Sequence, residues 1–329
     1  MSTRLSRRRF LSRSVAATAA APFVMSVEEH RLMAQTAAPK PAPKARRPPL
    51  SKRWTGKIGN VSISRLICGG NLMSGYAHSR DLIYVSPLLK HYHTDAKIME
   101  TWALCEEHGI NTMIAYAGDR HCIKLYRQYR KRGGKIQYLA QINPDPKNLR
   151  TAVDEAVEAD AVGAFLVGNT GDLWAREKAV GRIADIVGLI KDVDLIAGVA
   201  GHELRTPRVC EAGGVEPDFY VKTLHDRSYW SKQQPGQDRD VIDNYAIDNY
   251  WCQDPEKVIG FMSNVPRPWI AYKVLAAGAI HPRDGFKYAF QNGADFALVG
   301  MFDFQVAENV TVANQVLSNI AARERTWRA

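Results

Sequence analysis

The hydrophobic positions of this chain fall into eight short runs, separated by stretches with helical periodicity. The runs are rich in Val, Ile, Leu, Phe and Ala and are bounded by Gly, Asp, Asn or Pro, which is typical of strands buried on both faces. They cover residues 61–70, 111–116, 135–143, 163–169, 194–202, 218–225, 268–279 and 295–302. Strands that alternate with helices predict crossover connections and a parallel sheet. Eight such units predict an α/β fold, a (β/α)8 TIM barrel.

A doubly wound open sheet is the alternative for a chain of alternating strands and helices. The count of eight strands favours the barrel, and so does the absence of a GxGxxG turn after the first strand. In such barrels the functional residues lie where each strand meets the loop that follows it. The ends of the predicted strands are therefore the places to search for chemistry.

The first residues depart from this pattern. Residues 6–11 read SRRRFL, and a mildly apolar, Ala-rich run follows at 14–25, which is too short to span a membrane. This resembles a twin-arginine (Tat) export leader, which implies the Tat export machinery as a partner and a place in the periplasm or at the outer face of the cytoplasmic membrane. We predict a Tat-type signal region at 1–37, a linker rich in Pro and basic residues at 38–54 and a single barrel domain at 55–329. The alternatives are an ordinary basic, disordered N-terminus and an uncleaved leader that anchors the protein.

The formal charge of +10 belongs to the N-terminal region. Residues 1–53 contain 12 Lys and Arg against 2 Asp and Glu, which leaves 32 of each sign on residues 54–329. The balanced domain gives no support to nucleic-acid binding. The five cysteines form no CxxC pair, so a zinc knuckle or a thioredoxin-type motif is not supported either. The expected partner of the domain is a small-molecule substrate, with no transmembrane span; oligomer formation stays open.

The start of the predicted domain resembles a known family. Residues 57–76 read KIGNVSISRLICGGNLMSGY, and residues 93–116 read HTDAKIMETWALCEEHGINTMIAY. Together they are similar to the start of an aldo/keto reductase, in which a first strand is followed by a helix that ends in Gly-Ile-Asn. The resemblance implies the barrel fold and the NADPH-dependent reduction of a carbonyl group.

The residues that carry the chemistry of that family are not matched in this chain. Ile114 stands where the family has an Asp, and Tyr116 follows too early to be its catalytic Tyr. An Ala-Gln pair ending at Gln141 replaces a Thr-Lys pair, and a Gly-Asn pair ending at Asn169 stands where a His is expected. The resemblance therefore supports the fold more than the reaction, and NADP is the less favoured cofactor.

Two histidines end adjacent predicted strands. His202 closes the fifth strand and His225 the sixth, while Asp303 follows the eighth. Together they form a candidate set of nitrogen and oxygen ligands for a divalent metal. The set is similar to part of the amidohydrolase pattern, whose His-x-His on the first strand is missing here. Both histidines are also candidate catalytic groups for proton transfer.

Two lysines lie inside apolar runs, Lys222 in FYVKTL and Lys273 in IAYKVL. A buried ammonium group must be paired or must lose its proton. A lysine in such a place can form a Schiff base with a carbonyl substrate or act as a general base. Both lysines are therefore predicted to be catalytic, and a structural pairing with an acidic side chain is the alternative.

Polar and aromatic side chains near the strand ends are candidate substrate contacts. Amide groups offer donors and acceptors in fixed directions, and flat aromatic rings suit sugar rings. The predicted contacts are Asn71, Tyr116, Gln141, Asn143 and Asn169, together with Trp230 and Trp251 from the long segment at 226–256. Capping of a following helix is the simpler explanation for Asn169 and for Asp303.

These features together predict an exported TIM-barrel enzyme that acts on a small polar carbonyl or hydroxyl compound of carbohydrate-like character. Its chemistry would be acid–base or metal-assisted, as in a lyase, an isomerase or a hydrolase. An aldo/keto reductase-type oxidoreductase and a non-catalytic ligand-binding barrel are the alternatives. The sequence does not identify the substrate or the cofactor, for which a divalent metal is the candidate.

Overall fold

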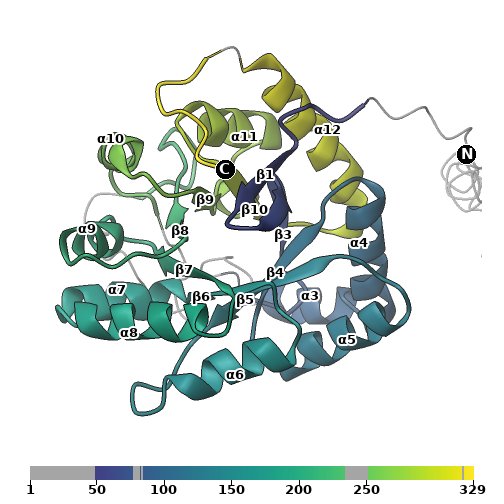
Figure 1. The fold of residues 1–329 in the computed structure, drawn as a ribbon. Helices are drawn as coiled ribbons and strands as arrows, with labels where there is room; N and C mark the ends of the chain where they lie inside the picture. The colour runs from purple at the N-terminus through teal and green to yellow at the C-terminus, as the bar shows by residue number, and fades with distance from the viewer. Residues whose placement is uncertain (1–48, 77–81, 83, 234–250, 321) are drawn as a thin grey trace, which may run out of the picture. The chain divides into compact units, whose positions relative to one another are not determined.

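Eight parallel strands close into a barrel in the order β10-β3-β4-β5-β6-β7-β8-β9 (Figure 1). They are β3 (Leu66–Gly69), β4 (Thr112–Tyr116), β5 (Gln137–Ile142), β6 (Gly163–Leu166), β7 (Ile196–Gly201), β8 (Phe219–Thr223), β9 (Trp269–Tyr272) and β10 (Phe296–Gly300). The predicted α/β TIM barrel is thereby confirmed. The computed structural model describes residues 49–76, 82, 84–233, 251–320 and 322–329. The predicted signal region lies outside the described residues.

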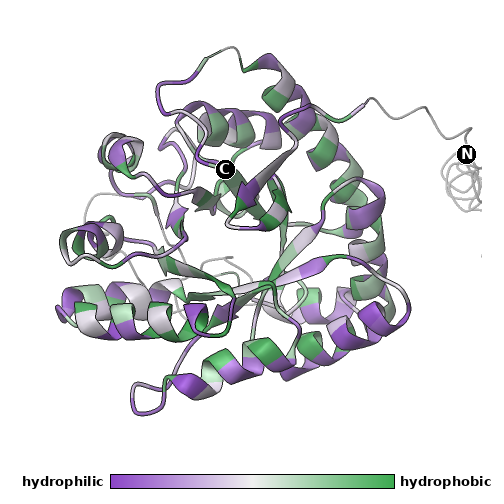
Figure 2. Ribbon diagram, in the orientation of Figure 1, coloured by the Kyte–Doolittle hydropathy of each residue, from purple (hydrophilic) through white to green (hydrophobic). Residues whose placement is uncertain are grey.

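Helices connect the strands and surround the barrel (Figure 1). They are α3 (Val85–Tyr92), α4 (Asp95–Glu107), α5 (Arg120–Lys131), α6 (Arg150–Glu158), α7 (Gly168–Arg176), α8 (Val180–Lys191), α9 (Arg205–Ala212), α10 (Pro255–Asn264), α11 (Pro282–Gln291) and α12 (Asp303–Asn319). Their hydrophobic faces turn towards the strands and their polar faces turn outwards (Figure 2). In α5, for example, the side chains of Cys122, Leu125, Tyr126 and Tyr129 are buried at helical spacing. Within the described part of the chain, every helix is too short or too polar to cross a membrane.

The apolar core has two layers, and the strand residues alternate between them. The inner layer fills the barrel, with Phe219, Val221 and Ile270 among its members. The outer layer lies between barrel and helices, and Tyr220 and Leu224 belong to it. Successive residues of a strand point to opposite faces of the sheet, so these memberships tell which side of β8 each residue occupies.

The N-terminal end of the barrel is covered by a hairpin of β1 (Thr55–Ile58) and β2 (Val61–Ser64), whose residues Ile58 and Ile63 join the inner layer. The first predicted strand, 61–70, is therefore wrong in one respect, because its first half pairs in this hairpin and only its second half enters the barrel. The folded unit begins at Leu50, so the last residues of the predicted linker pack with the barrel.

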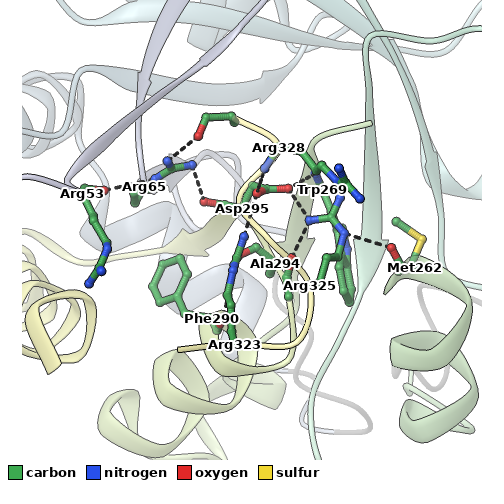
Figure 3. Close-up of polar contacts among 12 residues, drawn as sticks. Arg53, Arg65, Met262, Trp269, Phe290, Ala294, Asp295, Arg323, Arg325 and Arg328 are labelled. Atoms are coloured by element: carbon green, nitrogen blue, oxygen red, sulfur yellow. Dashed lines mark hydrogen bonds and ion pairs between the residues drawn. The ribbon is translucent and has the colours of Figure 1, made fainter. Parts of the chain in front are cut away.

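A buried carboxylate fastens the C-terminal segment across the same end of the barrel (Figure 3). Asp295, which precedes β10, is fully buried. It accepts hydrogen bonds from Arg325 Nη1 at 2.7 Å, from Arg323 Nη2 at 3.0 Å and from the backbone N–H of Trp269 at 3.0 Å. Burial lowers the pKa of Arg323 to about 10, which still leaves the guanidinium charged at neutral pH. This network closes the N-terminal end with ion pairs.

Candidate active site

Three neighbouring strands bring polar side chains to the C-terminal end of the barrel. Thr223 ends β8 and pairs in register with Tyr272, which ends β9. Gly201 of β7 pairs with Lys222, so that His202, the next residue, comes level with Thr223. The ring centroids of His202 and Tyr272 lie 5.2 Å apart. The two rings therefore lie close together at the end where barrel enzymes carry out their chemistry.

A buried carboxylate on α7 holds His202 in place. Asp172, 1 % exposed, accepts a hydrogen bond from His202 Nδ1 at 2.8 Å and from the His202 backbone N–H at 2.9 Å. Its other oxygen accepts from the backbone N–H of Glu203 at 3.1 Å and from the hydroxyl of Thr206 at 2.6 Å. Four donors thus converge on one carboxylate, which fixes the position and the orientation of the imidazole ring.

Close packing between α7 and β7 makes this contact reachable. A Cβ atom at Gly171 would lie 2.2 Å from the carbonyl oxygen of Ala200, so only glycine permits the approach of helix and strand seen here. A Cβ atom at Gly168 would lie 2.6 Å from Cε1 of His202 and 2.7 Å from the hydroxyl of Tyr272. The two glycines let Asp172 reach His202 and leave room for both rings.

The surroundings of His202 determine its protonation state. Burial lowers the pKa of His202 to about 4, although the hydrogen bond to Asp172 acts in the opposite direction, and the nearby Lys273 lowers the pKa further. The ring is therefore neutral at neutral pH. Because Nδ1 faces a carboxylate, Nδ1 carries the proton, and Nε2 is the basic nitrogen of the ring.

Lys273 lies directly after β9 and not inside a strand as predicted. The strand was predicted over 268–279, but β9 ends at Tyr272, and Lys273 begins a turn with φ +59°, a left-handed conformation that is uncommon for lysine. Its Nζ lies 5.7 Å from the ring centroid of Tyr272. His202, Tyr272 and Lys273 consequently form one group of neighbouring side chains.

A cavity of about 170 Å³ opens beside His202, between the end of β7 and the start of α10. Its lining includes Glu203, Arg208, Lys222 and Lys257, so both signs of charge face it. A cavity of this size holds a molecule of roughly six non-hydrogen atoms, judged by engineered cavities of similar volume. Tyr272 and Lys273 are not part of this lining, so the cavity adjoins His202 from the side of Lys222 and α10.

Lys222 is buried within its strand as predicted, but it occupies the outer face. Phe219 and Val221 belong to the inner layer and Tyr220 to the outer one, which puts Lys222 on the side of the helices. Its Nζ donates to the carbonyl oxygen of His202 at 2.6 Å and to that of Thr223 at 3.1 Å. The prediction assumed a lysine inside the barrel. Because both faces of this strand are apolar, its sequence does not show which face points into the barrel.

The three predicted metal ligands are not brought together. His225 accepts a hydrogen bond from the backbone N–H of Cys252 at Nε2, 3.1 Å away, and its Nδ1 lies 3.0 Å from the carbonyl oxygen of Lys273. Asp303 accepts from the Tyr92 hydroxyl and from the Lys97 ammonium group. Among the described residues no three His, Cys, Asp or Glu side chains are grouped so as to hold a metal ion. The two histidines follow adjacent strands, but each has its own hydrogen-bond partners, Asp172 for His202 and backbone groups for His225.

The predicted substrate contacts are spread over several environments. Tyr116 and Gln141 are paired neighbours at the ends of β4 and β5, and both are half-buried. Asn143 accepts a hydrogen bond from the Thr170 hydroxyl, and Asn169 lies in the first turn of α7 and not at a strand end. Trp251 packs into a small apolar cluster with a 4 % exposed side chain, whereas Trp230 is 84 % exposed and Asn71 is exposed. Tyr116 and Gln141 are thus the members that end barrel strands side by side.

Sequence reasoning missed Asp172 and Tyr272. Asp172 lies inside a helix, where an acidic residue usually faces solvent, and Tyr272 ends an apolar strand. The useful signal for Asp172 was the spacing G-x-x-G-D at 168–172, because two glycines in a helix indicate close packing against another element.

Comparison with known proteins supports the fold. No family model matches the sequence, and no curated protein matches it. A solved structure described as "Putative aldo-keto reductase from Pseudomona aeruginosa" shares 17% identity and a TM-score of 0.52, over 82% of this chain and 94% of the other. A second crystal structure with the same description shares 16% identity and a TM-score of 0.54, over 80% and 96%. The apo structure of Gox0644 shares 10% identity and a TM-score of 0.54, over 86% and 97%. At these identities the likeness is one of fold alone.

Proposed function

We propose that this protein is an enzyme that transfers protons on a small polar carbonyl or hydroxyl compound at the C-terminal end of its barrel. The observation that carries the proposal is the buried hydrogen bond between His202 and Asp172. The carboxylate favours the tautomer with a proton on Nδ1, and Nε2 is then the nitrogen that accepts a proton from the substrate. The resulting imidazolium forms beside a carboxylate that stabilises its charge.

The neighbouring groups suit a reaction that passes through an enolate. His202 takes a proton from the carbon beside a carbonyl group, and negative charge then develops on the carbonyl oxygen. Tyr272 and Lys273, next to the imidazole, are the candidate donors to that oxygen. His202 returns the proton to the substrate in a second step, so a lyase or an isomerase reaction is favoured over hydrolysis.

The acid–base route has more support than the metal-assisted route. A metal site would need two or more ligands around His202, and both ring nitrogens of His225 have hydrogen-bond partners in the protein. The cavity beside His202 is lined by Glu203, Arg208 and Lys257 and not by Tyr272 or Lys273, so it supports the proposal only in that polar groups gather next to His202. Its lining of carboxylate, ammonium and guanidinium groups is compatible with a compound that carries several hydroxyl groups.

Proton exchange with solvent tests this proposal before the product is known. The full chain is incubated in D₂O with a panel of small hydroxyaldehydes, hydroxyketones and hydroxy acids, and the loss of the C–H signal next to the carbonyl is followed by proton NMR. We expect exchange of at least one compound, and a loss of roughly 100-fold or more in His202→Gln. His121→Gln is the matched control, because His121 also pairs with an aspartate, Asp95, but on the surface.

Two results of that experiment contradict the proposal. The first is exchange of no compound by the wild-type protein, which removes the carbonyl and hydroxyl class. The second is exchange that continues in His202→Gln at the wild-type rate, which removes His202 as the proton-transfer group.

We further propose that the folded enzyme is exported by the Tat route. The support is the SRRRFL motif, which lies outside the described residues. The full chain, expressed in a bacterium with an active Tat system, should appear in the periplasmic fraction. Arg7→Lys together with Arg8→Lys should retain it in the cytoplasm. Equal distribution of the two proteins would remove the proposal.

A further inference from the structure

His225 connects three segments at the C-terminal end of the barrel. It follows β8, it is 2 % exposed, and its ring lies edge to face with Tyr229 at 5.5 Å. The backbone N–H of Cys252 donates to Nε2 at 3.1 Å, so Nε2 is the unprotonated nitrogen. Nδ1 therefore carries the proton and donates it to the carbonyl oxygen of Lys273 at 3.0 Å. Both ring nitrogens of this histidine thus bind backbone groups, and the Tyr229 hydroxyl lies 3.3 Å from Nε2, to which it can also donate.

The turn that receives this hydrogen bond has an unusual backbone. Lys273, Ala276 and Ala277 all have positive φ, at +59°, +43° and +58°. Each such residue costs roughly 1–2 kcal/mol relative to an ordinary conformation. Three within five residues persist only where surrounding contacts hold them, and backbone outliers of this kind gather at functional sites.

Two sets of contacts hold the turn. Ala276 packs with Tyr229, Trp251 and Ile280 in a small apolar cluster that is separate from both core layers. The carbonyl oxygen of Lys273 accepts from His225 and also from the backbone N–H of Ala276 at 2.9 Å. The apolar cluster holds the end of the turn through Ala276. The imidazole of His225 holds its beginning through the carbonyl group of Lys273.

We propose that His225 is a positioning residue for the reaction proposed above. Its Nδ1–H···O=C hydrogen bond holds Lys273 in the left-handed conformation, which directs the lysine side chain to Tyr272 and His202. The inference rests on the proposed function for the role of Lys273, but the hydrogen bond and its effect on the backbone can be measured without a substrate.

Two substitutions separate the two halves of the contact. In His225→Asn the side-chain amide nitrogen lies near the position of Nδ1, so the donor to Lys273 remains while the acceptor for Cys252 is lost. In His225→Gln the amide oxygen lies near the position of Nε2, so the acceptor remains and the donor is lost. A purely structural histidine predicts similar effects of the two variants, whereas a positioning residue predicts a large effect of His225→Gln alone.

The first readout is the environment of the Lys273 side chain. Lysines are reductively methylated with ¹³C-formaldehyde, and the Lys273 signal is assigned as the one that disappears in Lys273→Arg. Because Nζ lies 5.7 Å from the ring centroid of Tyr272, we expect the ring to shift this signal away from those of surface lysines. We expect His225→Asn to preserve the shift and His225→Gln to move it to the surface value. An unchanged signal in His225→Gln, or equal movement in both variants, would overturn the inference.

The second readout is a double-mutant cycle on stability, which remains informative if His225→Gln is poorly folded alone. Glycine adopts positive φ without strain, so Lys273→Gly should remove the need for the hydrogen bond. We expect the shift in urea midpoint caused by His225→Gln to fall by half or more in the Lys273→Gly background. Additive shifts would contradict a role in holding the backbone.

The third readout is turnover in the exchange assay. We expect His225→Gln to lower kcat by roughly 10- to 100-fold with KM little changed, and His225→Asn to stay within about threefold of wild type. If no compound exchanges in the wild-type protein, the proposed function fails while the first two readouts still decide the role of His225. If exchange occurs and the two variants behave alike, the inference fails alone.

Discussion

At each end of the barrel an aspartate is almost fully buried, and the two aspartates differ in their partners. Asp295 at the N-terminal end pairs with the guanidinium groups of Arg323 and Arg325, whereas Asp172 at the C-terminal end pairs with the imidazole of His202. Both also accept backbone N–H groups. A guanidinium keeps its proton throughout the physiological range, and an imidazole does not. The first carboxylate can only hold structure, while the second also orients a group that exchanges protons.

The two ends of the barrel also differ in how far they are shielded from solvent. The β1–β2 hairpin and the C-terminal segment cover the N-terminal end, and the side chains of Arg323 and Arg325 are nearly inaccessible to solvent. At the C-terminal end a cavity adjoins His202. TIM-barrel enzymes in general have a stability face at the N-terminal end and a catalytic face at the C-terminal end, and the proposed function assigns the two ends of this barrel in the same way.

The largest expected effect is the loss of the carboxylate at the N-terminal end. Asp295→Asn leaves the buried guanidinium groups of Arg323 and Arg325 without their counter-charge, which should cost about 3–5 kcal/mol in the free energy of unfolding. Urea denaturation followed by circular dichroism measures it, and the exchange activity of the remaining folded protein should be little changed. A cost below about 1 kcal/mol would show that the network is not a stability element.

The next effect is on the dependence of stability on pH. Burial lowers the pKa of His202 to about 4 in the folded protein, against about 6.5 in an unfolded chain. Between these values the unfolded chain binds the proton and the folded chain does not. The contribution of His202 is therefore fully present above pH 6.5 and is lost as the pH falls towards 4. The expected loss is about 2 kcal/mol between pH 7 and pH 5.

Urea unfolding at pH 7, 6 and 5 checks this in the wild type and in His202→Gln. The arginines at the N-terminal end stay charged in this range, and the buried His225 contributes equally to both proteins. The wild type should lose more stability than the variant on acidification. If the free energy of unfolding changed with pH by the same amount in the two proteins, His202 would not be a buried, neutral imidazole.

The barrel could be predicted from the sequence because its strands are apolar on both faces. For the same reason, the sequence did not show which strand residues point into the barrel. FYVKTL has apolar residues on either side, so nothing in the pattern says that Val221 faces inwards and Lys222 outwards. The first predicted strand likewise continued through Arg65, where the chain leaves the hairpin and enters the barrel. Periodicity finds strands, but it does not assign faces when both are buried.

The individual partners of the site depend on packing that a sequence pattern does not contain. His202 was predicted from its place at a strand end, yet its partner Asp172 comes from a helix that starts two residues after β6. His225 was also predicted from its place at a strand end, but its ring forms hydrogen bonds with backbone groups. Strand ends therefore select candidates, and the surrounding hydrogen bonds are what lead us to propose proton transfer for His202 and positioning for His225.

A smaller effect is expected from neutralising the carboxylate at the C-terminal end. Asp172→Asn keeps the shape of the side chain but places an N–H₂ group among donors, which should cost about 1–2 kcal/mol in the free energy of unfolding. The larger consequence is chemical, because the preference for the Nδ1–H tautomer of His202 is lost. Nitrogen-15 NMR of the imidazole should report an altered tautomer, and exchange activity should fall by roughly 100-fold or more. An unchanged tautomer with full activity would reduce Asp172 to a structural residue like Asp295.

The smallest effect is expected at the surface pair of the same chemical kind. His121 Nε2 lies 2.9 Å from Asp95, almost the distance found between His202 and Asp172, but the two side chains are 63% and 61% exposed. Water solvates both groups and screens their attraction, so His121→Gln should change the free energy of unfolding by at most about 0.5 kcal/mol. Its urea curve should overlay that of the wild type at pH 7. A loss of stability as large as that of Asp172→Asn would mean that the histidine–aspartate contact itself, and not its burial, distinguishes the C-terminal end of the barrel.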